Sequence, residues 1–174
     1  RIVQDMATPY KIGEQLTHKD NVALALSISG YYLGVIIVFL GAVFQPDAGP
    51  IGDNLGFNSD YWEDVATVFV YSVIGIAVLN IARIIVDRAV LYQFSTEKEI
   101  VTDQNAGTGA VEFGVYVAIS LVIAGSISGE GGGPEHSLAF LGLGLVTLAL
   151  YTLFYELTTS YKIHDEIERN NTAV

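Results

Sequence analysis

Four polar or charged residues lie inside or beside long apolar stretches, and they are the candidates for chemistry: Asn80, Arg83, Glu112 and Glu156. An acid inside a membrane-spanning helix is costly, and such acids often mark routes for ions or protons. Glu112 follows Ala106 by six residues, which places it about 9 Å inside its apolar stretch at 1.5 Å per residue. We therefore predict that the four residues form one polar cluster near the inner membrane surface.

More ordinary roles compete with an ion path at each position. Glu112 could be an interfacial acid paired with Arg83 or Arg88, and we favour this interpretation because Glu112 lies close to a helix end. Glu156 fits a solvated helix end. Asn80 could form a hydrogen bond to a neighbouring helix, which is the commoner use of such a residue in membranes.

Other kinds of site find no support in the composition. The chain has no cysteine, which excludes disulfides, zinc-thiolate sites and thiol nucleophiles. Its three histidines are scattered and form no helical pair, so we expect no metal site. The net charge of -11 argues against a nucleic-acid partner. We therefore expect neither an enzyme nor a bound cofactor.

Four long apolar stretches must position the polar residues. Half of the 174 residues are apolar and 16% are charged. A helix needs about 20 mostly apolar residues to cross a bilayer. The stretches cover 21–44, 65–82, 106–127 and 137–155. Buried helices of a large soluble protein are the alternative, but so short a chain has too little polar surface to cover them. We predict an all-α polytopic membrane protein with four transmembrane helices, in the lipid bilayer.

The basic residues predict the orientation. Every Lys and Arg lies in the N-terminal segment, the middle loop or the C-terminal tail, whereas the loops 45–64 and 129–136 carry acids alone. Basic residues mark the cytoplasmic side of a membrane. Both ends of the chain and the middle loop are therefore predicted to be cytoplasmic. Tyr61 and Trp62 suit an aromatic belt at the outer interface.

A shift of 84 residues aligns Asn21 with Asn105 and reveals a stripe of small residues in each odd span. Steps of 7, 4 and 7 residues return close to one helix face, and small residues let helices approach closely in lipid. Each Asn suits the cap of the following helix. The predicted packing residues are Ala23, Gly30, Gly34 and Gly41 in the first span and Gly107, Gly114, Ala118 and Gly125 in the second.

The repeat predicts two parallel-oriented two-helix units. An acid also precedes a tyrosine by five residues three times, at Asp5 and Tyr10, Asp87 and Tyr92, and Glu156 and Tyr161. The predicted division is a cytoplasmic segment that ends an earlier repeat (1–20), repeat one (21–92, spans about 21–44 and 65–91), repeat two (93–160, spans about 106–127 and 137–160) and a cytoplasmic segment that starts a further repeat (161–174). A dangling polar tail is the alternative for the last segment.

A family resemblance rests on the first stripe. The pattern Asn-x-Ala-x6-Gly-x3-Gly is formed by Asn21, Ala23, Gly30 and Gly34. This pattern, within NVALALSISGYYLG, resembles the signature of YjfL-like bacterial inner-membrane proteins, catalogued as domain of unknown function 350. The second copy departs from it at Gly107 and Ala118. The resemblance implies the bacterial inner (cytoplasmic) membrane and a repeated two-helix unit, and it implies no activity.

Two functions remain open at the level of the sequence. The first is a structural or accessory subunit that packs against further copies or other membrane subunits. The second is a small ion or proton channel or transporter that uses the polar cluster. We favour the first because packing residues repeat, whereas the repeat counterpart of Glu112 is Ile28.

Overall fold

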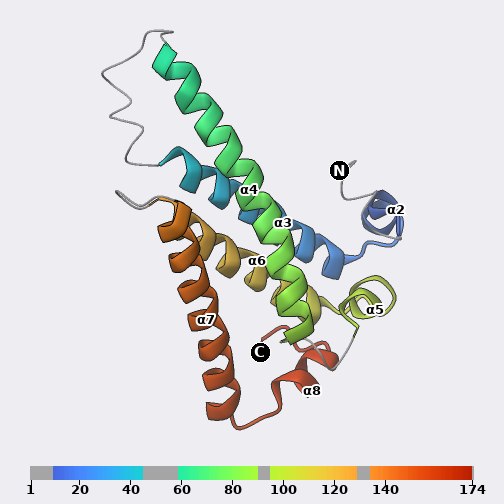
Figure 1. Ribbon diagram of the computed structural model, residues 1–174. Helices are drawn as coiled ribbons and strands as arrows, with labels where there is room; N and C mark the ends of the chain where they lie inside the picture. Colours follow the sequence, from blue (N-terminus) through green and yellow to red (C-terminus); the bar gives the residue numbers. More distant parts are fainter. Residues whose placement is uncertain (1–9, 45–58, 90–94, 129–133, 174) are drawn as a thin grey trace.

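The computed structural model describes residues 10–44, 59–89, 95–128 and 134–173, and their regular secondary structure is entirely helical (Figure 1). The long helices are α3 (Val22–Val43), α4 (Ser59–Ala89), α6 (Ala106–Ile127) and α7 (Pro134–Thr158). The short helices are α2 (Ile12–Thr17), α5 (Thr96–Val101) and α8 (Ile163–Glu168). The expectations for residues 1–9, 45–58, 90–94 and 129–133, and for the side chains of Tyr61, Asp87 and Arg88, lie outside the described part.

Each long helix contains a segment that is long and apolar enough to cross a membrane. The segments have a mean hydropathy of 2.0 to 2.2 and cover Val22–Val43, Val65–Ile85, Ala106–Ile127 and Glu135–Thr158. The prediction of an all-α polytopic membrane protein is confirmed. Helices α4 and α7 begin before their predicted spans because polar first turns precede the apolar residues.

Helices α3 and α6 run parallel and form the centre of the fold. A β-carbon built on Gly30 would lie 2.5 Å from the Cα of Phe113, and one built on Gly41 would lie 2.7 Å from the Cα of Ala124. From the first contact to the second, the residue numbers increase by 11 along both helices, so the helices point the same way. The backbones therefore touch directly, as small residues allow in lipid.

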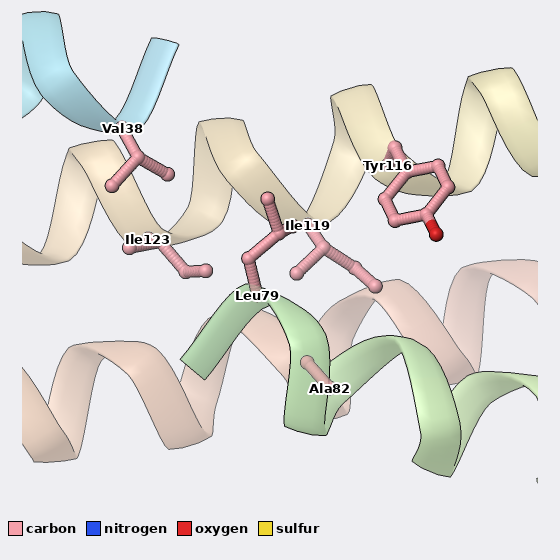
Figure 2. Close-up of a cluster of buried hydrophobic side chains, with 6 residues drawn as sticks. All are labelled: Val38, Leu79, Ala82, Tyr116, Ile119 and Ile123. Atoms are coloured by element: carbon pink, nitrogen blue, oxygen red, sulfur yellow. The ribbon is translucent and has the colours of Figure 1, made fainter. Parts of the chain in front are cut away.

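Helix α4 crosses both α3 and α6, and apolar side chains fill the junction. Figure 2 shows Val38 from α3, Leu79 and Ala82 from α4, and Ile119 and Ile123 from α6 in this cluster. All five are nearly or fully buried. Helix α7 packs mainly against α6, where Gly144 receives the side chain of Val122.

The stripe on α6 does not face α3. The α3 stripe packs against Gly109, Phe113 and Ala124, whereas a β-carbon on Gly114 or Gly125 would meet no described atom within 4 Å. The two stripes therefore make different contacts within the described residues, and the packing role of the α6 stripe stays a prediction. The physical reason is the parallel arrangement. Copies related by a one-directional step, rather than a two-fold axis, meet through two different faces.

Three turns of the chain share one geometry. Each of α2, α5 and α8 has six residues and is followed by a residue in the left-handed region. These residues are Asp20 (φ 49°), Gln104 (φ 51°) and Asn170 (φ 62°). An asparagine comes next in every case, at Asn21, Asn105 and Asn171. The three turns thus resemble one another in backbone geometry, and the division into repeated units stays a prediction.

The first two of these asparagines begin the central helices. The side-chain oxygen of Asn21 accepts from the Leu24 N–H at 2.9 Å, and that of Asn105 accepts from the Thr108 N–H at 3.1 Å. The predicted caps are thus confirmed. Each side-chain amide also donates to a short helix farther along the chain at 2.8 Å: Asn21 to the Ile100 carbonyl of α5 and Asn105 to the Ile167 carbonyl of α8.

Removing these bonds should be costly. We expect Asn21→Ala to lower the free energy of unfolding by about 2 kcal/mol, since it removes a helix cap and leaves the Ile100 carbonyl without its donor. Asn21→Ser keeps a capping oxygen and should lose about half as much. Unfolding in mixed micelles followed by circular dichroism measures both losses. The control is Asn80→Ala, which should change stability by less than about 0.5 kcal/mol because Asn80 is exposed. A serine variant as stable as the parent would show that the bond to Ile100 contributes nothing.

Candidate functional site

Glu112 is the charged residue around which the three central helices meet. Its side chain is 2% exposed. One carboxylate oxygen accepts from the Arg83 guanidinium on α4 at 2.8 Å, and the other accepts from the Ser27 hydroxyl on α3. Both oxygens therefore have protein donors. We call Ser27, Arg83, Glu112 and Tyr116 the ion-pair cluster.

One aromatic ring lies against the cation of this cluster, and a second ring packs on the first. The Arg83 guanidinium carbon lies 5.6 Å from the centre of the Tyr116 ring, a distance at which the ring face attracts a cation. Tyr116 meets Tyr31 edge to face, with ring centres 5.4 Å apart. The Arg83 side chain is 35% exposed, so the cluster has a charged residue at its edge and a buried carboxylate within.

The short helices gather at the end of the bundle where α3 and α6 begin (Figure 1). Glu112 belongs to the second turn of α6, counted from the Asn105 cap. Tyr10, which precedes α2, lies within electrostatic range. Burial raises the pKa of the Tyr10 hydroxyl above its usual value, the Glu112 carboxylate raises it further, and the Arg83 cation opposes the shift.

The structure brings together two of the four residues expected to form a cluster. Asn80 is exposed, and its amide donates at 2.7 Å to the Ile76 carbonyl of its own helix. Glu156 lies 3.6 Å from the His164 ring nitrogen, and its side chain is 45% exposed. The expected group of four therefore reduces to Arg83 and Glu112.

Sequence reasoning missed Ser27 and Tyr116. Ser27 precedes Ile28, the repeat counterpart of Glu112, but alignment of the repeats does not indicate which residues touch. One signal could have found Ser27. It shares a helix face with Ala23, Gly30 and Gly34, because steps of four, three and four residues return close to one direction.

One further hydroxyl lies near the carboxylate along α6. Thr108 is fully buried, and its hydroxyl has no hydrogen-bond partner among the described residues. It precedes Glu112 by one turn, so both point toward the same side of α6. The described residues contain no group of three or more acids or histidines suited to a metal ion. The site therefore offers proton-bearing groups and an ion pair.

Comparison with known proteins identifies the family of this chain. The family model described as Domain of Unknown Function (DUF350) matches residues 1–127, which include every member of the ion-pair cluster. The chain belongs to the DUF350 family. This DUF350 chain is also 24% identical over 164 residues to a UPF0719 transmembrane protein of Aquifex aeolicus (strain VF5). No solved structure matches it significantly.

That relative is longer than this chain. The match covers 92% of this chain but 54% of the relative, so the DUF350 chain spans about half the length of the protein it resembles. The relative is described as a transmembrane protein, and the four apolar helices agree with that description. The DUF350 chain is a multi-pass membrane protein.

Proposed function

We propose that this DUF350 protein is a structural or accessory subunit that packs into an assembly in the bacterial inner membrane. The observation that carries the proposal is the contact of α3 with α6, in which Gly30 and Gly109 bring two backbones together. Close packing of this kind stabilises helix association in lipid. The charged groups inside the bundle also join its helices, because the Glu112 carboxylate accepts hydrogen bonds from Ser27 on α3 and Arg83 on α4.

The ion pair selects one arrangement of the helices. An apolar face alone allows α4 to rotate or slide against its neighbours, since many apolar contacts are nearly equivalent. The bond between Arg83 and Glu112 specifies one register, because any other leaves a carboxylate buried without a cation. The ion-pair cluster thus fixes the position of α4 against α3 and α6.

The outer faces of α4 and α7 provide contact area for lipid and for other subunits. Large apolar side chains are exposed along both helices, including Phe69, Val73, Leu143 and Phe154. Further copies of the chain or other membrane proteins would pack on the α7 face, whereas the α4 face at Phe69 would meet lipid. The cytoplasmic side is proposed to be the short-helix end, because Lys11, Lys98 and Lys162 lie in or beside α2, α5 and α8.

A second function, a small ion or proton channel or transporter, is favoured by one observation. The Thr108 hydroxyl, which has no hydrogen-bond partner within the described residues, lies one turn from the Glu112 carboxylate inside the span. Buried ionisable groups of this kind carry protons in pumps and transporters. In this alternative Glu112 would exchange a proton, and Arg83 would stabilise its ionised form.

Flux measurements separate the two functions. The purified protein is reconstituted into vesicles that contain a pH-sensitive dye, and a potassium diffusion potential drives proton entry. We expect proton entry equal to that of protein-free vesicles, and no change with Glu112→Gln, because both carboxylate oxygens are bonded within the protein. The matched control is Glu156→Gln, which alters a partly exposed carboxylate outside the cluster.

Two results would overturn the packing role. Proton entry above the protein-free rate that is lost in Glu112→Gln and kept in Glu156→Gln would establish the transport function instead. A second measurement uses nanodiscs cut directly from native membranes with a polymer. A protein that behaves as a monomer in those discs would contradict an assembly subunit, whereas discs that contain additional copies or other subunits support it.

A further inference from the structure

Helix α7 packs against fewer helices than α4 does. The two helices occupy corresponding places in their units, each following a small-residue helix. Helix α4 packs against both α3 and α6, while the main contact of α7 is with α6. None of the apolar span of α7 is buried, compared with 22% of that of α4. A helix in the place that α3 has beside α4 would complete the contact.

The small-residue face of α6 lies open beside α7. On α3, β-carbons built on Gly30 and Gly41 would collide with α6. On α6, the corresponding Gly114 and Gly125 meet no described atom within 4 Å. The same stripe is therefore filled on one helix and open on the other. We call the face formed by Gly114, Ala118 and Gly125, together with the adjoining side of α7, the open groove.

The third asparagine turn leads to the base of this groove. The Asn170 side chain accepts from the Gly107 N–H at 3.1 Å, and a β-carbon built on Gly107 would lie 3.3 Å from the Asn171 carbonyl oxygen. The Asn171 amide donates to Glu166 at 3.1 Å, just as the Asn105 amide donates to Glu99 at 2.9 Å. The turn at Asn171 thus resembles the turn that precedes α6 at Asn105, with the Asn171 side-chain oxygen accepting from the N–H two residues on rather than three.

We infer that the open groove is the docking site for a third small-residue helix, and that its occupant is the helix continuing from Asn171 in the full-length protein. The chain's own continuation is favoured over a second copy by the position of α8. A second copy that inserted α3 in the same register would bring its α2 and Asn21 into the place that α8 and Asn171 already fill. The longer relative, of which this chain covers 54%, has room for such a helix. The inference rests on the proposed packing role and names the partner of that surface.

Cysteine labelling tests the inference: these 174 residues contain no cysteine, and any cysteine elsewhere in the full-length protein is first replaced by serine. In the full-length protein in native membranes, cysteines are placed one at a time and exposed to a lipid-soluble maleimide. The probe position is Ala118→Cys in the groove, and the lipid-facing control is Phe69→Cys, whose side chain is 68% exposed. We expect labelling at Ala118 to be at least about tenfold slower than at Phe69, since a docked helix must open first.

A second variant distinguishes an open groove without a docked helix from a loss of the contact between α3 and α6. Ser120→Cys is nearly isosteric and lies fully buried toward α3, so slow labelling there reports that the central pair is intact. Slow labelling at both Ser120 and Ala118, without disulfide-linked dimers after oxidation, supports the inference. Labelling at Ala118 as fast as at Phe69, with Ser120 protected, overturns it and leaves the packing role standing. Dimers linked through Ala118→Cys overturn it in favour of a second copy. Fast labelling at Ser120 contradicts the proposed packing itself.

Discussion

The Arg83→Met variant is expected to lose about 3 kcal/mol of unfolding free energy, the lower end of what breaking a buried ion pair costs. Methionine keeps much of the apolar stem, so the loss comes from the charge. The Glu112 carboxylate, 2% exposed, would remain buried with only the Ser27 hydroxyl as donor. The lower end applies because the Arg83 side chain is 35% exposed and its charge is already partly solvated. Unfolding in mixed micelles, followed by circular dichroism, measures the change.

Two companion variants identify the cause of that loss. Glu112→Gln should lose about 1 kcal/mol, because the amide oxygen still accepts from Arg83 and the cation can turn toward water. The double variant Arg83→Met, Glu112→Leu should recover most of the stability, since apolar replacements of both partners are often neutral. A double variant no more stable than Arg83→Met would contradict this explanation. It would assign the loss to packing of the arginine stem.

The fold could be predicted from the sequence because its signals are local. Apolar length predicts the spans, and the asparagines predict the caps. The partners of the polar residues depend on direction around the helix axis, which the sequence gives only relative to a known contact. Asn80 and Glu156 lie at suitable depths but point away from Glu112. Depth along a helix is countable from the sequence, whereas the neighbour on each side must come from the packing.

The α6 stripe illustrates the same limit. The alignment pairs Gly30 with Gly114, yet within the described residues a β-carbon on Gly30 would meet the neighbouring helix and one on Gly114 would meet no atom within 4 Å. Aligned positions share a residue type and a place along the helix, but they can have different neighbouring helices. The α6 stripe has small residues suited to a helix contact, but no described helix packs against Gly114 or Gly125. The missing information is therefore the identity of the neighbouring helix, and no local pattern supplies it.

The close approach of α3 and α6 predicts a graded effect of adding single methyl groups. Gly109→Ala and Gly30→Ala should each lose about 3 kcal/mol, because the new β-carbon meets the Ala23 carbonyl oxygen in one case and the Phe113 Cα in the other. Backbone atoms cannot move aside without separating the helices. Gly75→Ala should lose less, about 2 kcal/mol, since its obstacle is the Val38 side chain, which is buried and stiff but can move more than backbone.

Gly142→Ala is the matched control for this series. Its β-carbon would meet no described atom within 4 Å, so alanine should gain about 0.5 kcal/mol from its higher helix propensity. The sign of the effect thus reverses between α6 and α7 for one chemical change, as measured by unfolding in mixed micelles. Equal effects at Gly109 and Gly142 would mean that helix propensity, not contact, governs both positions. Helices α3 and α6 would then stand farther apart than described, and the packing on which the proposed function depends would be absent.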